Sequence, residues 1–327
     1  MTEKIRWGIL GTGRIARKFC DTLKELEEAQ LWAVGSRTQQ KAEDFGGAYG
    51  IPHCYGSYQE LVQDKGVDII YVATPIACHY ENVKLCLQAG KHVLCEKAFT
   101  QTAAEAEELY RLAQERRLFL MEALWSKCQP VFRKLMEWKE QGRFGEIQAV
   151  EAKFYTCATT EHRLMRDRTQ GGSLYDLTIY PLTYACALLG YEPERIHALA
   201  AAGGDDVDTV ESIQLSYGNG SFASLTGGLS CEKQVSLYIH GVKARVLINR
   251  EFFFQAQGAV LLDWQNQPIE EFRAPFAISG YEYEAQEAMA CVRQGRLTSS
   301  LVPMEETIRV IRLMEECRRQ WGKETGY

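Results

Sequence analysis

The feature that most constrains the fold is a short glycine-rich turn near the start of the chain. An apolar run over residues 5–10 leads into Gly11-Thr12-Gly13-Arg14-Ile15-Ala16, and a helical pattern follows at once. In the pattern G-x-G-x-x-G/A the first glycine permits a tight turn, the second lets the backbone approach a pyrophosphate, and the small third residue lets the helix pack closely. The helix N-terminus then faces the anion. A strand before and a helix after supply the context that this motif requires, so we expect a dinucleotide site at Gly11, Thr12, Gly13, Arg14 and Ile15; the alternative is a tight turn with a structural role only.

The first 124 residues alternate strand and helix signals. Residues 67–73 form a near-continuous apolar run, as expected of a strand that is buried on both faces. Thr102 and Glu105 have the spacing of a capping box at the start of a helix. Such alternation predicts a Rossmann domain over residues 1–124, built on a doubly wound parallel sheet.

The pattern changes after residue 124. Apolar and polar residues alternate over residues 150–155, and strand signals dominate from about 195 to 272, with Asn219-Gly220 as a two-residue hairpin signal. Two helices are expected near residues 281–294 and 303–321. Strands without intervening helices predict an α+β domain over residues 125–327 with a large, mostly antiparallel open sheet.

Charge and cysteine content exclude several classes of protein. The chain has 327 residues and a net charge of −6, which disfavours nucleic acid or an anionic membrane surface as a partner. No stretch approaches the roughly 20 apolar residues of a membrane span, and the N-terminus lacks the apolar core of a secretion signal. The 11 cysteines are odd in number and include no Cys-x-x-Cys pair. Reduced thiols in a cytoplasmic protein are the expectation, with no metal site.

The end of the second strand bears on which dinucleotide binds. NAD-binding proteins usually carry an acid there for the adenosine ribose, whereas this chain has Ser36-Arg37-Thr38, with Lys41 one turn later. Arginine and hydroxyl side chains suit a 2′-phosphate, so the sequence predicts NADP over NAD, with NAD still possible.

Further cofactor contacts are expected where later strands of the sheet end. Thr74, Pro75, Glu96 and Lys97 follow apolar runs at the carboxyl edge, where ligands bind in such sheets. His79 is either a further cofactor contact or a structural helix residue.

Lys97, Asp176 and Tyr180 are the candidate catalytic residues. Asp176 and Tyr180 are four residues apart, which on a helix places them on one face. Ser173 is a candidate N-cap, and Pro181 predicts that the helix is bent or interrupted.

A free phenol has a pKa of about 10 and is a poor base at neutral pH. The ammonium group of Lys97 would favour the phenolate, with Asp176 as an orienting group. Tyr180 would then take a hydroxyl proton while hydride leaves for nicotinamide. Its alternative role is that of a packed aromatic residue.

Taken together these motifs resemble the glucose–fructose oxidoreductase/inositol dehydrogenase/MocA (Gfo/Idh/MocA) family over essentially the whole chain. The resemblance rests on the Gly11 motif, Thr74-Pro75, Glu96-Lys97 and the segment from Gly171 to Tyr180. Tyrosine at 180, together with residues 121–125, is similar to the dimeric dihydrodiol dehydrogenase and D-xylose dehydrogenase branch. That resemblance implies a Lys97–Tyr180 catalytic pair, with Trp125, Phe154, Asp176 and Tyr180 lining a substrate pocket. It also implies use of NADP and a homodimer formed through the C-terminal sheet.

Two positions depart from the family pattern, and the substrate stays open. Ala98 stands where the family has proline after the lysine, and Thr178 where the branch commonly has glycine. The expected reaction is hydride transfer between NADP and a sugar or cyclic vicinal diol. The alternatives are an NADPH-dependent reductase of a dicarbonyl or keto-sugar, and a nucleotide-sensing protein without catalysis. Four polar residues either help to form the rim of the pocket or belong to a solvated loop, and the loop is the preferred interpretation: Glu161, His162, Arg163 and Arg166.

Overall fold

The computed structural model describes residues 3–158, 171–202, 207–248 and 253–322. Contacts between Cα atoms group the chain into a first unit, Met1–Cys128 with Ala277–Ile308, and a second unit, Gln129–Phe276 with Arg309–Tyr327. The sequence predicts one domain boundary at residue 124. It does not predict that residues 277–308 return to the first unit. This return is made by α8 (Glu282–Gln294), which packs on α1 (Arg14–Lys24), and by the hydroxyls of Thr22 and Ser279, which lie 2.7 Å apart. Periodicity indicates the apolar face of α8 but not the unit which that face covers.

The first unit contains a parallel sheet of six strands in the order β3-β2-β1-β4-β5-β6. This is the order of a doubly wound dinucleotide-binding sheet, and it confirms the predicted fold. The strands are β1 (Ile5–Leu10), β2 (Ala29–Gly35), β3 (His53–Tyr55), β4 (Ile69–Val72), β5 (His92–Glu96) and β6 (Leu120–Ala123).

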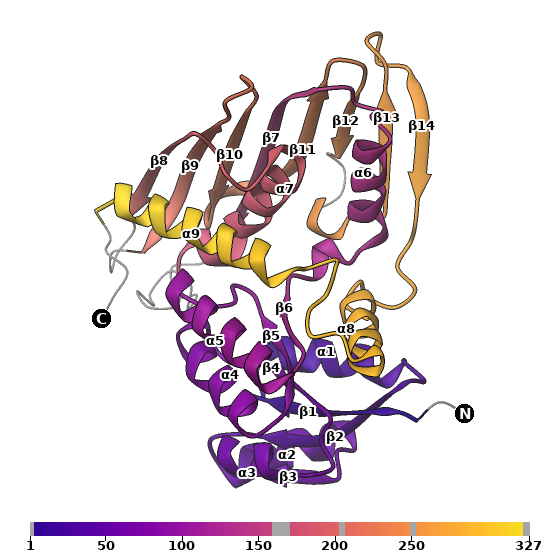
Figure 1. Ribbon diagram of the computed structural model, residues 1–327, viewed down its shortest axis with the longest axis vertical. Coiled ribbons are helices and arrows are strands. Elements are labelled where there is room, and N and C mark those ends of the chain that lie inside the picture. The colour runs from indigo at the N-terminus through magenta and orange to yellow at the C-terminus, as the bar shows by residue number, and fades with distance from the viewer. Residues whose placement is uncertain (1–2, 159–170, 203–206, 249–252, 323–327) are drawn as a thin grey trace. The chain divides into compact units, whose positions relative to one another are not determined.

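Helices connect these strands. Besides α1 they are α2 (Gln39–Tyr49), α3 (Tyr58–Gln63), α4 (His79–Gln88) and α5 (Ala103–Arg116). The helices α4 and α5 lie side by side, as Figure 1 shows. The predicted capping box is present, since Thr102 accepts from the Glu105 amide and Glu105 accepts from the Thr102 amide. β4 is buried throughout, in agreement with its continuous apolar run.

The second unit contains an eight-stranded sheet in the order β14-β13-β12-β11-β7-β10-β9-β8. All neighbouring pairs are antiparallel except β7 and β10, so the predicted mostly antiparallel sheet is confirmed. The strands are β7 (Ile147–Cys157), β8 (Arg195–Ala202), β9 (Asp208–Ser216), β10 (Phe222–Gly228), β11 (Ser230–Gly241), β12 (Arg245–Ile248), β13 (Gly258–Leu262) and β14 (Pro268–Arg273).

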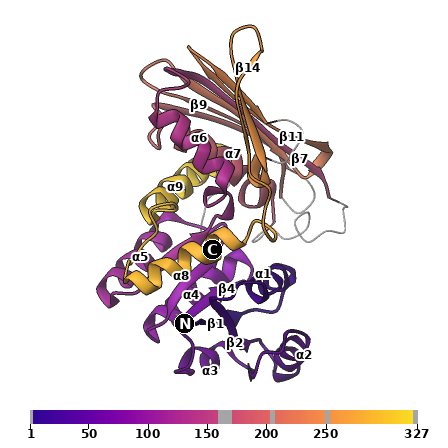
Figure 2. The same cartoon turned by 90° about the vertical axis from the view of Figure 1, so that its right-hand side faces the viewer.

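One face of this sheet is covered by helices α6 (Pro130–Glu140) and α7 (Ile179–Leu189), as Figure 2 shows. The residues of β7 that face the helices, Val150, Ala152 and Phe154, are buried. Helix α9 (Met304–Gln320) ends at Gln320, whose amide side chain bonds the backbone of β8. The predicted hairpin joins β9 and β10, but its turn is longer than two residues because Tyr217 donates to the carbonyl of Ser221.

Candidate active site

The turn after β1 has the geometry of a phosphate site. Gly11 has a φ of +103°, and a Cβ atom there would lie 3.0 Å from the carbonyl oxygen of Ala73, so the turn requires glycine. Gly13 is the N-cap of α1 without a side-chain cap bond, and a Cβ atom on it would approach no described atom closer than 4.0 Å. Thr12 and Ile15 are partly exposed and Arg14 is exposed. Uncapped amides at an open helix N-terminus fit a pyrophosphate.

The residues predicted to select NADP lie at the end of β2. Ser36 is buried, with its hydroxyl oxygen 3.3 Å from that of Thr12, so it supports the glycine turn. Arg37 and Lys41 are exposed. Thr38 is the N-cap of α2 and accepts a hydrogen bond from the Lys41 amide at 3.4 Å, which leaves its hydroxyl hydrogen able to donate.

His79 ties together two of the loops at the carboxyl edge of the sheet. Its Nε2 atom lies 2.7 Å from the carbonyl oxygen of Thr74, and its Nδ1 atom lies 3.0 Å from that of Ala98 and 3.2 Å from that of Phe99. Burial lowers the pKa of this ring, while the carbonyl contacts act in the opposite direction. Asn82, which belongs to no recognisable sequence motif, donates to the Thr74 hydroxyl at 3.1 Å. Pro75 is exposed beside this loop.

Lys97 directly follows β5 and is partly exposed, and its peptide bond to Ala98 is cis. The preceding Glu96 is buried; it accepts hydrogen bonds from the Tyr71 hydroxyl and, at 3.1 Å, from the Lys97 amide. Glu96 therefore anchors the backbone at Lys97, and its contact with the cofactor stays a prediction from the sequence. Tyr71 belongs to β4, and the apolar sequence of that strand does not predict the hydrogen bond from the Tyr71 hydroxyl to Glu96.

Three buried glutamates lie close enough in the first unit to influence one another. Glu96, Glu122 and Glu284 are at most 7% exposed, and both side-chain oxygens of Glu284 lack a hydrogen-bond partner among the described residues. Burial, together with the charges of Glu96 and Glu122, raises the pKa of Glu284 well above its ordinary value. Glu122 accepts from the Phe99 amide at 3.1 Å and from the Thr307 hydroxyl at 2.8 Å. Glu284 therefore retains its proton to a higher pH than an ordinary glutamate does.

Asp176 and Tyr180 lie on either side of a change in helix type. Residues Leu174–Thr178 form a π-helix, η4, and α7 begins at Ile179, so the predicted interruption is present. π-Helical turns inside helices occur frequently at functional sites. Asp176 is the one residue of 171–180 that is not buried. Ser173 makes no cap bond, contrary to expectation; Asp208 of β9 accepts from the Leu174 amide at 2.9 Å instead.

Tyr180 lies in an aromatic cluster that includes the predicted pocket residue Phe154. The rings of Tyr180 and Phe254 stack with centroids 4.8 Å apart, Phe254 stacks on Phe154 at 4.5 Å, and Phe154 lies 6.0 Å from Tyr180. In the first unit, Trp125 stacks on Tyr281 at 4.2 Å. Phe254 and Tyr281 were not predicted, because each is far in sequence from the motif that it joins.

Comparison with known proteins assigns the chain to a family. A profile described as an oxidoreductase family with an NAD-binding Rossmann fold matches residues 5–124, and a profile of the GFO/IDH/MocA C-terminal domain matches residues 132–247. The chain belongs to the Gfo/Idh/MocA oxidoreductase family. The resemblance inferred from the sequence motifs is thereby confirmed, and the chain is an enzyme of the oxidoreductase class.

Among curated relatives in this family, trans-1,2-dihydrobenzene-1,2-diol dehydrogenase from Mus musculus is 33% identical over 97% of both chains. The Homo sapiens protein of the same name is 30% identical, again over 97% of both. Among solved structures, the 3-ketoreductase KijD10 from Actinomadura kijaniata with NADP and TDP-benzene has a TM-score of 0.86 at 27% identity, covering 97% of this chain and 98% of that one. Aldose-aldose oxidoreductase from Caulobacter crescentus, complexed with glycerol, has a TM-score of 0.86 at 26% identity over 97% of both.

The four residues predicted to form a pocket rim or a solvated loop lie outside the described residues: Glu161, His162, Arg163 and Arg166. Across the described ranges, no group of three or more His, Cys, Asp or Glu side chains could hold a metal ion. The same ranges contain no helix long and apolar enough to cross a membrane.

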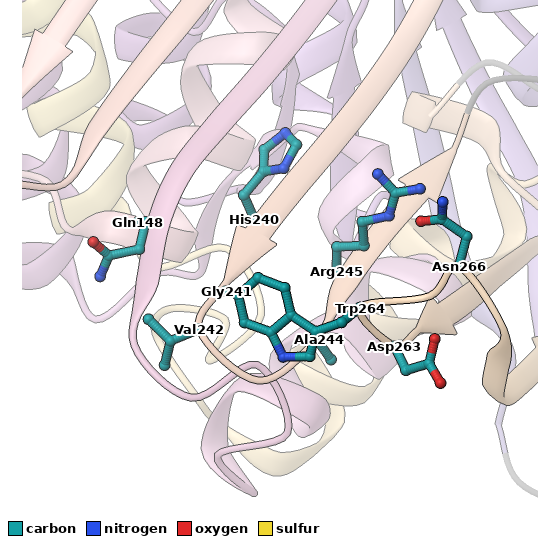
Figure 3. A pocket seen from close by; sticks show the side chains of 9 residues that line it. All are labelled: Gln148, His240, Gly241, Val242, Ala244, Arg245, Asp263, Trp264 and Asn266. Atoms are coloured by element: carbon teal, nitrogen blue, oxygen red, sulfur yellow. The ribbon is translucent and has the colours of Figure 1, made fainter.

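A pocket of about 340 Å³ lies elsewhere in the second unit of this oxidoreductase. Figure 3 shows His240 and Arg245, which are cross-strand partners on β11 and β12, with Trp264 and Asn266 from the turn between β13 and β14. This pocket is lined by none of the predicted site residues, so we do not assign it as the active site.

Proposed function

We propose that this protein is an NADP-dependent dehydrogenase that transfers hydride between NADP and a C–OH group of a sugar or cyclic vicinal diol. The observation that carries the proposal is the placement of Lys97 immediately after β5, in a sheet whose first turn has the geometry of a dinucleotide site. Full-length similarity to diol dehydrogenases supports a diol as substrate. The KijD10 complex with NADP supports the choice of cofactor.

The first unit supplies the groups that would hold the cofactor. The amides at the start of α1 and the backbone of Gly11 and Gly13 would bind the pyrophosphate. Arg37, with the Ser36 and Thr38 hydroxyls and Lys41, would bind the 2′-phosphate. Thr74, Pro75 and Lys97 would lie beside the nicotinamide end, as the carboxyl edge of such a sheet predicts. Bound there, the nicotinamide supplies the acceptor or donor of hydride.

When the substrate is oxidised, side chains of the protein remove the proton of its hydroxyl group. Tyr180, as phenolate, takes the proton from the substrate hydroxyl as the C–H bond gives up hydride and the C–O bond becomes a carbonyl. The Lys97 ammonium favours the phenolate, and Asp176 accepts a hydrogen bond from the substrate and so orients it. The aromatic rings of Phe154 and Trp125 would pack against the carbon skeleton. In reduction, each of these transfers runs in reverse.

Reduction of a keto-sugar is the second candidate, because KijD10 is a 3-ketoreductase. The two directions are distinguished by a substrate panel. NADP⁺ reduction over aldoses and trans-diols, and NADPH oxidation over keto-sugars and dicarbonyls, are followed by the absorbance of the reduced nicotinamide. The candidate with the higher kcat/KM is the supported one. The non-catalytic alternative has no observation in its favour.

The acid–base pair is tested with Lys97→Met and Tyr180→Phe. We expect kcat to fall by roughly 10²–10⁴ in each, since proton transfer by a positioned side chain contributes about this much. NADPH binding, measured by fluorescence titration, should be retained in Tyr180→Phe. The matched control is Tyr184→Phe, the same change one turn along α7, where the hydroxyl donates to the Phe253 carbonyl. Full turnover in Tyr180→Phe would refute the mechanism.

We also propose a homodimer formed through the sheet face opposite α6 and α7, and a cytoplasmic location. Leu199 of β8 and Phe222 of β10 alternate with the buried Ala198 and Ala223, so they point away from the helices, and they are 75% and 44% exposed. Large apolar side chains exposed on a sheet face suit a partner surface. All eleven cysteines are free thiols, which suits a reducing compartment.

A further inference from the structure

Two buried acids on β9 contact the π-helix η4 that precedes Tyr180. Asp208 and Glu211 are 2% and 1% exposed. Asp208 accepts from the amide of Leu174, the first residue of η4, at 2.9 Å. Glu211 accepts from the hydroxyl of Thr178, the last residue of η4. The two ends of the π-helix are thus each held by one carboxyl group, from a strand more than thirty residues later in the chain.

Two glycines make room for these contacts. A Cβ atom on Gly172, which has a φ of +96°, would lie 2.4 Å from Oδ1 of Asp208. A Cβ atom on Gly227, the cross-strand neighbour of Glu211, would lie 1.9 Å from the Thr178 hydroxyl oxygen. Thr178 is wholly buried. The sheet accommodates this side chain because residue 227 carries no Cβ atom.

The contacts act through hydrogen bonds in a site shielded from water. Burial, with the charge of Asp208, raises the pKa of Glu211 well above its ordinary value, although the bond from Thr178 acts in the opposite direction. Removal of the Thr178 hydroxyl would take from this buried carboxyl group one of the hydrogen bonds that offset its desolvation. Loss of the Thr178 hydroxyl should therefore be relieved by movement of η4 away from β9.

We propose that Asp208 and Glu211 are positioning residues, which fix η4 through the Leu174 amide and the Thr178 hydroxyl and thereby set the placement of Asp176 and Tyr180. The inference rests on the proposed function for the role of Tyr180. Asp176 lies within η4, and Tyr180 is the second residue of α7, directly beyond the Thr178 contact. A relaxation of the π-helix to a regular α-turn would rotate both side chains about the helix axis. Misplacement of a reacting group by about 1 Å can cost roughly 10²-fold in rate.

The test compares Thr178→Val, which has the same shape without the donor, with Thr178→Ser, which keeps the donor. The matched control is Thr183→Val in α7, because Thr183 is buried and its hydroxyl has no partner among the described residues. Glu211→Leu removes the acceptor, and the double variant Thr178→Val/Glu211→Leu completes a double-mutant cycle. Each protein is assayed for kcat, KM and NADPH binding, and for hydrogen exchange of the peptide covering residues 171–182.

We expect Thr178→Val to lower kcat about 10- to 100-fold with little change in NADPH affinity, and to accelerate exchange in that peptide. Thr178→Ser should recover most of the activity, Thr183→Val should match the wild type, and the double variant should be no worse than Glu211→Leu alone. Wild-type kcat and exchange in Thr178→Val, equal losses in Thr183→Val, or additive effects in the double variant would overturn the proposal. Turnover of Tyr180→Phe decides the proposed function separately, and the exchange measurement decides the positioning role whether or not that function holds.

Discussion

Arg37 is the residue on which the choice of cofactor depends most. It is exposed at the end of β2, where the segment 35–38 contains no carboxylate for a ribose hydroxyl. We expect Arg37→Ala to weaken NADP⁺ binding about 10- to 100-fold and NAD⁺ binding little, because only NADP carries the 2′-phosphate. Arg116→Ala, at an exposed arginine on α5, is the control. Titration calorimetry measures both affinities, and equal kcat/KM of the wild type with the two cofactors would contradict the assignment.

Glu284 should lower stability at neutral and alkaline pH. Its folded-state pKa lies above the unfolded value, so the native state binds the proton more tightly, and stability falls as pH rises from the unfolded pKa toward the folded one. Glu284→Gln removes this loss. We expect its free energy of unfolding to exceed that of the wild type by about 1–2 kcal/mol at pH 8, and by less at pH 5.

Urea unfolding at the two pH values measures the effect of Glu284→Gln. Glu287→Gln, in the same helix α8, is the matched control, because Glu287 accepts hydrogen bonds from Arg296 and Ser299 and should lose stability on neutralisation. A gain for Glu284→Gln that is equal at pH 5 and pH 8 would show that proton binding at Glu284 is not the cause.

At the scale of elements, the two glycines of the turn that joins β1 to α1 are expected to have different roles. Gly11 is needed for folding, and Gly13 for binding of the cofactor. Gly11→Ala places a methyl group against the Ala73 carbonyl in a backbone region that favours glycine, and should cost about 1–3 kcal/mol of stability. In Gly13→Ala the new Cβ atom would lie 4.0 Å from the Ala73 carbonyl oxygen, an ordinary contact, so stability should stay within about 0.5 kcal/mol. This substitution should nevertheless weaken NADPH binding at least tenfold, since its methyl group would occupy the approach to the pyrophosphate.

Thermal unfolding and fluorescence titration of the two glycine variants provide the measurement. If Gly13→Ala binds NADPH as well as the wild type does, the pyrophosphate does not approach this turn. Equal destabilisation of the two variants would contradict the distinction drawn from their surroundings.

Only part of the structure around Tyr180 could be predicted from the sequence. Pro181 predicted an irregular helix, because proline lacks an amide hydrogen, and the irregularity is present. The π-helical form and the cap at Leu174 were not predictable. Both depend on acids of β9, more than thirty residues away in the chain, whereas Ser173 was the nearest residue of capping type.

At the scale of the whole molecule, the proposed homodimer would form through the face of the eight-stranded sheet opposite α6 and α7. Phe222→Glu places a charge on that face, and we expect it to shift the proposed dimer toward monomer in light scattering after gel filtration. Ile278→Glu is the control, since Ile278 is 37% exposed and belongs to the first unit. A wild-type protein that is monomeric at micromolar concentration would refute the dimer itself.

The sequence by itself determined the kinds of elements, the classes of the two sheets and the glycine turn, because hydrophobic period, capping residues and turn chemistry are properties of short windows of chain. Only the tertiary structure decided which residues meet. It placed 277–308 with the first unit, Tyr281 on Trp125, Phe254 on Tyr180, and Asp208 and Glu211 on η4. These pairings join residues far apart in sequence, and their energies come from burial and from hydrogen bonds made after the chain has folded, which no local pattern encodes.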